Sequence, residues 1–192
     1  RRERRKEDGT TLVLRNLATG DEHRFERVAS YRFSEDGRRL VYAASSRDGE
    51  SDGVFVVDVA SGRSTPVLTG PGVYKQLAFD RSGDQLAFIT DRDDHDADHP
   101  TFTLYHWRAG QAEARPVART GSRGLPAGWV VSEHAELRFS DSGRRLFFGT
   151  SPRPIPDPDP DTLPPEDERV KLDVWNWRDP FIQPMQLVQA ER

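Results

Sequence analysis

The chain has 192 residues, which is long enough for one domain with a buried core. Charged residues make up 31% of it with both signs interspersed, the net charge is −4, and no basic face stands out, so the composition argues against a nucleic-acid partner. No apolar stretch approaches the roughly 18 residues that span a bilayer, which argues against a membrane segment, and the absence of cysteine excludes disulfides and thiolate metal sites.

The first eight residues form a charge run that is rich in arginine. We interpret this run as a solvated segment, because the acids Glu3, Glu7 and Asp8 interrupt it and argue against a basic targeting signal. A start of this kind, without an initiating methionine, is typical of the interior of a longer chain.

One strand–turn–strand pattern recurs along the chain. Residues 11–17 predict a strand, a polar turn ending in Gly20 follows, and 23–28 predict the returning strand. The turns that end in Gly62 and Gly110 repeat this pattern. Their flanking strands are predicted over 54–59, 63–68, 102–107 and 112–118, and a degenerate copy of the turn stands at 177–180. Glycine is expected at these turns because it adopts positive φ without a steric penalty.

A second hairpin alternates with the first. Residues 33–42 read Phe-Ser-Glu-Asp-Gly-Arg-Arg-Leu-Val-Tyr, and residues 79–88 and 139–148 repeat the aromatic, the turn glycine and the Leu-x-aromatic ending. Asp and Ser favour such turns because their side chains bond the nearby backbone. We therefore interpret Asp36, Gly37, Gly83 and Gly143, together with Gly20, Gly62 and Gly110, as structural turn residues.

The two hairpins alternate with a period that predicts a β-propeller. Gly37 and Gly83 are 46 residues apart, and Gly20 and Gly62 are 42 apart. Four short strands in about 40–50 residues are the content of one propeller blade. The fold class is therefore all-β, with about three four-stranded antiparallel blades over residues 1–150 and no convincing helix. An immunoglobulin-type sandwich would not explain why the same two hairpins alternate.

The composition changes after Thr150. Residues 151–168 hold seven prolines and six acids, which predicts an extended loop outside the sheets. Residues 169–192 then predict the start of a further blade, with strands over 170–177 and 183–189. Three blades do not close a ring, because propellers have about four to eight. We therefore expect a fragment of a larger ring or, alternatively, a homodimer in which two open fans complete one ring.

The repeats resemble those of known proteins. The Phe-Ser-x-Asp-Gly-Arg-x-Leu units are similar to the propeller repeats of TolB-like proteins and of prolyl oligopeptidase-family serine peptidases. Residues 171–186 contain Trp-Asn-Trp-Arg-Asp-Pro and resemble a segment of large bacterial members of that peptidase family, which also follows a Pro- and acid-rich loop. The resemblance implies a propeller that precedes and caps an α/β-hydrolase domain carrying Ser, Asp and His.

No catalytic, cofactor-binding or metal-binding residue is predicted in this chain. The stretches Gly149-Thr150-Ser151-Pro152 and Gly121-Ser122-Arg123-Gly124 both miss the Gly-x-Ser-x-Gly pattern of a nucleophile elbow. No peptidase activity is therefore expected from this chain alone.

Three sets of residues are candidates for binding sites. The acidic insertion at 91–99 contains Asp91, 93, 94, 96 and 98 with His95 and His99; a solvated loop is the preferred interpretation and a Ca²⁺ site the alternative. His23, His106 and His134 are scattered, which argues against zinc. Trp175 and Trp177 share one strand face, where they pack between blades or contact a partner.

The leading hypothesis is a non-catalytic propeller segment of a serine peptidase that gates or shapes the access of peptides to a hydrolase domain. Its partners would be the remaining blades and the hydrolase domain of its own parent chain, together with the peptide substrate. The alternative is a TolB-like propeller for protein interaction with no enzymatic role. The compartment stays open, although the resemblance favours the bacterial periplasm or secretion.

Overall fold

The computed structural model describes residues 6–155 together with Arg178, Phe181 and Met185. The chain divides into two compact units, Arg1–Pro154 and Ile155–Arg192. All the strands described below lie in the first unit. In the second unit the described side chains are exposed, and Met185 is helical, so the strand expected over 183–189 is not present at that position.

The first sheet has five antiparallel strands in the order β1-β2-β3-β4-β5. They are β1 (Thr10–Arg15), β2 (Glu22–Phe33), β3 (Arg39–Ala44), β4 (Gly53–Asp58) and β5 (Arg63–Thr69). Both predicted hairpins are present in it: the turn at Gly37 joins β2 to β3, and the turn at Gly62 joins β4 to β5. The alternating hairpins therefore build one blade between β2 and β5, as the period predicts.

Strand β2 belongs to two ladders. Its first residues, Glu22 to Phe25, pair with β1, whereas Ser30 to Phe33 pair with β3. Between the two ladders Arg27 adopts a φ of 59°, and the register with β3 shifts between Val28 and Ser30. The sequence predicted separate strands at 23–28 and around Phe33, but this irregularity lets the chain continue as one strand. As a result, the β1–β2 hairpin adds β1 to the first sheet as a fifth strand.

The second sheet repeats the blade with four antiparallel strands in the order β6-β7-β8-β9. They are β6 (Tyr74–Phe79), β7 (Gln85–Thr90), β8 (Thr103–Arg108) and β9 (Arg115–Ala118). The acidic insertion between β7 and β8 contains the short 3-10 helix η1 (Arg92–Asp94).

Two short two-stranded sheets follow the second sheet, and because both join the same two stretches of chain we call them together the third sheet. Strand β10 (Trp129–Val131) pairs with β13 (Thr150–Pro152), and β11 (Arg138–Phe139) pairs with β12 (Leu146–Phe147). The described residues therefore form two complete blades and the first hairpin of a third, which is a partial propeller without closure. The predicted strand at 170–177 lies outside the described residues.

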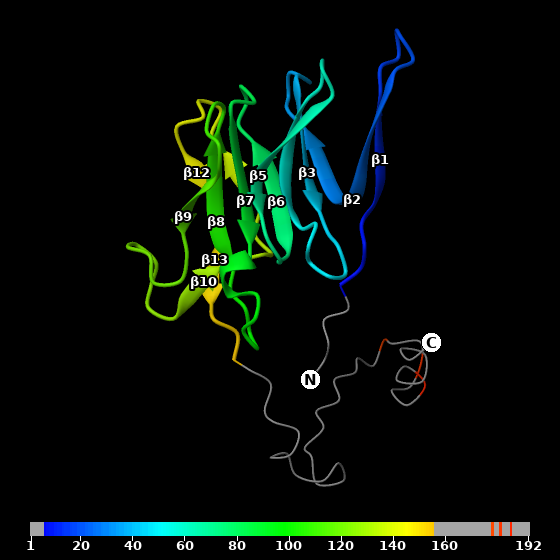
Figure 1. Ribbon diagram of the computed structural model, residues 1–192. Helices are drawn as coiled ribbons and strands as arrows, with labels where there is room; N and C mark the ends of the chain where they lie inside the picture. The colour runs from blue at the N-terminus through cyan, green and yellow to red at the C-terminus, as the bar shows by residue number, and fades with distance from the viewer. Residues whose placement is uncertain (1–5, 156–177, 179–180, 182–184, 186–192) are drawn as a thin grey trace. The chain divides into compact units, whose positions relative to one another are not determined.

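The three sheets stand side by side (Figure 1), and alternating side chains pack between them. Val41 and Ala43 of β3 pack with Leu86 and Phe88 of β7 between the first and second sheets. The intervening residues of β7, Ala87 and Ile89, face the other way and pack against the third sheet.

The first strands of successive sheets lie next to each other, because β6 neighbours both β2 and β11. These three inner strands define the axis side of the propeller. The outer face of the first sheet is covered by its own β1–β2 hairpin, where the Phe25 ring packs 5.3 Å from that of Tyr42.

Candidate functional site

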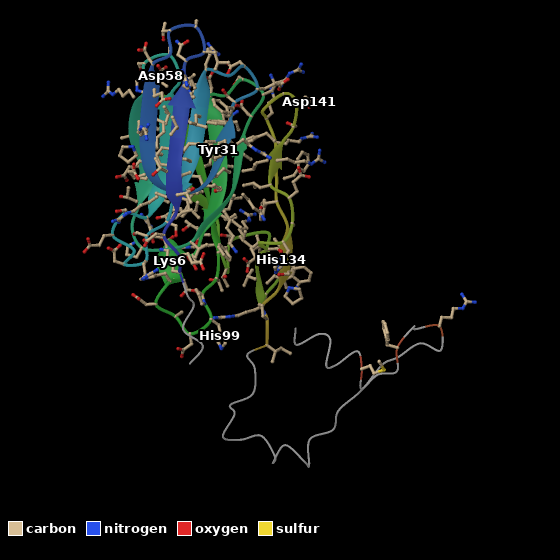
Figure 2. All side chains as sticks on the ribbon, turned by 90° about the vertical axis from the view of Figure 1, so that its right-hand side faces the viewer. Lys6, Tyr31, Asp58, His99, His134 and Asp141 are labelled. Atoms are coloured by element: carbon tan, nitrogen blue, oxygen red, sulfur yellow. The ribbon has the colours of Figure 1, made fainter. Side chains whose placement is uncertain are left out.

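Two hollows lie at opposite ends of the inner strands. Figure 2 shows Asp58 and Asp141 at one end of the sheets, which we call the turn end, and Lys6, His99 and His134 at the other, the loop end. The hollow at the loop end has a volume of about 650 Å³ and the one at the turn end about 400 Å³. Charged residues at the wall of the loop-end hollow are Lys6, Arg47, Asp48, Lys75, Asp91 and Glu133.

Asp52 anchors one side of the loop-end hollow. Its side chain is fully buried and accepts hydrogen bonds from the backbone N–H groups of Ser46 at 2.8 Å and Gly72 at 3.0 Å. Lys6 forms an ion pair with it and also donates to the Gly72 carbonyl at 3.0 Å. Burial lowers the pKa of Lys6, while the carboxylates of Asp91 and Asp48 oppose that effect. One carboxylate thus joins three separate segments of the chain.

Lys75 and Glu133 form the opposite side of this hollow. Lys75 on β6 makes an ion pair with Glu133 and lies 5.6 Å from the centre of the Phe102 ring, which is a cation–π distance. The neighbouring Gln76 donates to the Glu133 carbonyl at 2.6 Å. These contacts tie the second sheet to the segment that follows β10 on this side of the hollow.

Asp91 and Asp94 of the insertion at 91–99 accept hydrogen bonds from neighbouring segments, whereas Asp96 and Asp98 are exposed. Asp91 is buried and accepts from the Val73 N–H at 2.6 Å, so the expectation of a solvated side chain is wrong at this position. Asp94 accepts from the Thr101 N–H and hydroxyl, both at 2.9 Å. No group of three His, Cys, Asp or Glu side chains in the described part of the chain could hold a metal ion, so the Ca²⁺ alternative finds no ligand set there.

Asp93 holds the base of the insertion against β8. It accepts a hydrogen bond from the Tyr105 hydroxyl at 2.6 Å and from the Arg92 guanidinium at 3.0 Å. Burial, together with the hydrogen bond to Asp93, raises the pKa of Tyr105 to about 12. The hydroxyl acts as the donor in this hydrogen bond.

The turn end is built from three equivalent turns at residues 34–39, 80–85 and 140–145, which we call the turn stack. In each turn the first side chain accepts the backbone N–H of the sixth residue: Ser34 from Arg39 at 3.0 Å, Asp80 from Gln85 at 2.9 Å, and Ser140 from Arg145 at 3.1 Å. The aromatic residues that precede the turns, Phe33, Phe79 and Phe139, all line the turn-end hollow. This hollow therefore lies where the three inner strands meet.

The turn glycines do more than provide a positive φ. A Cβ on Gly83 would lie 2.9 Å from the Ser34 Cβ of the preceding turn, and one on Gly143 would lie 3.0 Å from Asp80 Oδ2. Gly37, in the first turn, has no neighbour within 4 Å. Gly83 and Gly143 thus allow adjacent blades to approach closely, a role that is not visible in one sequence because it depends on a residue far away in the chain.

Two of the described histidines, His23 and His106, pack against neighbouring residues. The His23 ring lies against Gly62, and His106 bonds Gln85 at 3.1 Å and packs 6.1 Å from the Phe139 ring. Burial lowers the pKa of His106, and Arg108 adds to this effect. Among the described residues no histidine ring is hydrogen-bonded to a serine hydroxyl, so no nucleophile–base pair is formed there.

Other predicted residues lie elsewhere. Ser122 lies in an irregular stretch between two turns and Ser151 in β13, neither on the strand–turn–helix that a nucleophile elbow requires. Trp175 and Trp177 lie outside the described residues, so their predicted partner contact stays a prediction. No helix in the described part of the chain has the length and apolar character needed to cross a lipid bilayer.

No protein-family model matches the chain, and no curated protein sequence matches it. Solved structures to which it is similar include the β-propeller domain of the Trilobed protease from Pyrococcus furiosus, at 17% identity and a TM-score of 0.44 over 63% of this chain and 39% of that one. TolB from Acinetobacter baumannii has 16% identity and a TM-score of 0.46 over 73% of this chain and 32% of that one.

A third similar structure comes from a study of two prolyl endopeptidases, with 17% identity and a TM-score of 0.48 over 73% of this chain and 22% of that one. The chain therefore spans well under half of each of these three structures. At these identities the likeness concerns the fold alone.

Proposed function

We propose that this chain is a non-catalytic propeller segment of a serine peptidase of the prolyl oligopeptidase family, and that it restricts which peptides reach a hydrolase domain located elsewhere in the parent protein. The observation that carries the proposal is the pair of hollows at the two ends of the inner strands. Neither hollow has a nucleophile beside a base among its described residues, so the arrangement suits passage or selection of a chain rather than its cleavage.

The chemistry of the loop-end hollow suits an extended peptide. Its wall carries side chains of both charges together with the Phe102 ring. The backbone amides and the varied side chains of a bound peptide could therefore form contacts with it. Its opposite sides are held by the Asp52–Lys6 and Lys75–Glu133 ion pairs. Because these side chains are tied to neighbouring segments, contacts within the fold hold the opening in place. Such an opening would exclude a folded protein and admit an extended peptide.

The first test is to read the gene beyond the codon for Arg192 and to assay the full product. A Gly-x-Ser-x-Gly elbow and hydrolysis of a short chromogenic peptide are expected. If the elbow is absent, the peptidase assignment fails and the TolB-like interaction propeller takes its place.

The gating role is tested on the full product with the double variant Lys75→Ala, Glu133→Ala. Removing this ion pair should raise kcat/KM several-fold for a long peptide and leave it unchanged for a short peptide with the same cleavage site. Arg24→Ala, on the exposed part of the β1–β2 hairpin, serves as the matched control and should change neither value. Equal effects on both peptides would contradict gating at this opening.

A further inference from the structure

The turn stack repeats one contact between neighbouring sheets. Arg39 in the first turn donates to the carbonyl of Gly83 in the second turn at 2.6 Å. Gln85 in the second turn donates to the carbonyl of Gly143 in the third at 3.0 Å. In both cases the sixth residue of one turn binds the turn glycine of the next sheet.

In each contact, the charge of the donor side chain avoids repulsion with the residue that follows the glycine. Asp84 follows Gly83, and the cationic Arg39 also bonds its carboxylate at 2.6 Å. Arg144 follows Gly143, and there the donor is the neutral Gln85. Because like charges in contact are unfavourable and opposite charges are favourable, a cationic donor fits an acidic residue after the glycine.

The third turn copies the donor side of the first. Ser140 and Arg145 occupy the positions of Ser34 and Arg39, and Arg144 that of Arg38. Arg145 is exposed, and its guanidinium has no hydrogen-bond or ion-pair partner within the described part of the chain. The third turn therefore presents the same donor as the first without the glycine carbonyl and carboxylate that the first one binds.

The free face around Arg145 continues the two interfaces already formed. Leu146 packs against the second sheet, so the alternating side chain of Phe147 faces away from it. Phe147 is 43% exposed, whereas Val41 and Ala87 at the equivalent positions are 0% exposed. The Arg138 guanidinium carbon lies 5.1 Å from the centre of the Phe147 ring on this face. Positions that are buried between blades elsewhere are thus open on the third sheet.

We propose that this face binds a further blade whose turn carries a glycine followed by Asp or Glu, with Arg145 donating to the glycine carbonyl and to the carboxylate. The inference rests on the proposed function, because a propeller segment needs further blades to complete its ring. Residues 150–192 contain no glycine, so the partner turn is not within this sequence. A second copy of the chain is disfavoured, because Arg38 follows Gly37 in its first turn and would meet Arg145.

The pairing rule can be tested within the 192-residue chain. Asp84→Arg should lower Tm, because it places two cations together. Adding Arg39→Gln should restore part of the loss, because it recreates the second contact, in which the neutral Gln85 binds a glycine carbonyl that is followed by Arg144. If the double variant is as unstable as the sum of the two single variants, the rule is wrong.

The proposed blade is tested on the full gene product. The first propeller turn encoded after Arg192 should have Asp or Glu directly after its glycine. Arg145→Gln should lower Tm of the full product about as much as Arg39→Gln does, but leave Tm of the 192-residue chain unchanged. Arg144→Gln is the matched control and should have little effect in either protein.

The outcomes separate this inference from the proposed function. A downstream turn with a neutral or basic residue after its glycine, or an Arg145→Gln variant of the full product with unchanged Tm, overturns the docking inference and leaves the peptidase proposal standing. Absence of any further propeller turn overturns the docking inference together with the ring on which it rests. A chain that forms stable dimers through the Arg145 face would also overturn it in favour of a second copy.

Discussion

At the turn end of the sheets three copies of one turn stack on each other, whereas at the loop end segments of unrelated sequence meet around buried or half-buried ion pairs. The turn end is held where the Arg39 and Gln85 side chains donate to the backbone carbonyls of Gly83 and Gly143, at equivalent positions of the repeat. The loop end is held by side chains such as Asp52 and Lys75, which reach across long distances in the sequence. The repeat thus sets the spacing of the blades, while the loops between strands are free to differ and to form the larger hollow.

The largest effect is expected at the loop end, from Asp52→Ala. The variant leaves Lys6 half-buried without its carboxylate and removes the acceptor of two backbone N–H groups, which should cost about 3 kcal/mol of unfolding free energy. Denaturant unfolding measures this loss. Asp48 lies in the same loop and has an exposed side chain. Asp48→Ala should therefore lower the unfolding free energy by less than about 1 kcal/mol. Similar losses for both variants would show that Asp52 is not the anchor of this end.

An intermediate effect is expected at the turn end, from Gly83→Ala. Alanine at positive φ costs about 1–2 kcal/mol, and the clash with Ser34 adds about 1–3 kcal/mol of overpacking. Gly37→Ala provides the matched comparison, because Gly37 has a φ of 70° against 73° for Gly83 but has no neighbour within 4 Å. Thermal unfolding of the two variants should therefore differ clearly. Equal losses would mean that the turn glycines serve their own turns only.

The smallest effect is a dependence on acid at the first turn. The hydrogen bond from Ser34, together with bonds from the Arg38 backbone and side chain, lowers the pKa of Asp36 to about 2. Because the folded-state pKa is below the unfolded value, the contribution is present above about pH 4 and is lost as the pH falls through about 2. The Tm difference between the wild type and Asp36→Asn should shrink over this range. A difference that stays constant would contradict the assignment.

The comparison of the two ends also explains which features could be predicted from sequence. The alternating hairpins, the four-stranded order of β6 to β9 and the positive φ of the turn glycines depend on residues close together in the chain, so their pattern is visible in it. The site at the loop end was not predicted. Asp52 and Gly72 belong to no repeated pattern. Lys6 was interpreted as part of a solvated charge run, which is wrong at this position because Lys6 pairs with the buried Asp52. Asp91 and His95 were interpreted only as members of an acidic loop.

The interpretation of the acidic insertion as solvated was wrong at Asp91 for a specific physical reason. An acidic run next to a strand is usually solvated, but Asp91 is buried because the Val73 N–H, on the link into β6, requires an acceptor there. The continuous strand β2 was missed in a similar way, since nothing local predicts that Arg27 adopts a positive φ.

The sequence by itself determined the all-β class, the two alternating hairpins and the lack of a nucleophile elbow, because these depend on local turn chemistry and on the two-residue period of strands. Only the tertiary structure decided that Gly83 and Gly143 are contact points between blades, that Asp52 joins three segments, and that Arg145 and Phe147 face outward on the third sheet. The reason is that each of these roles depends on a neighbour many residues away, which the packing of one sheet against the next brings into contact.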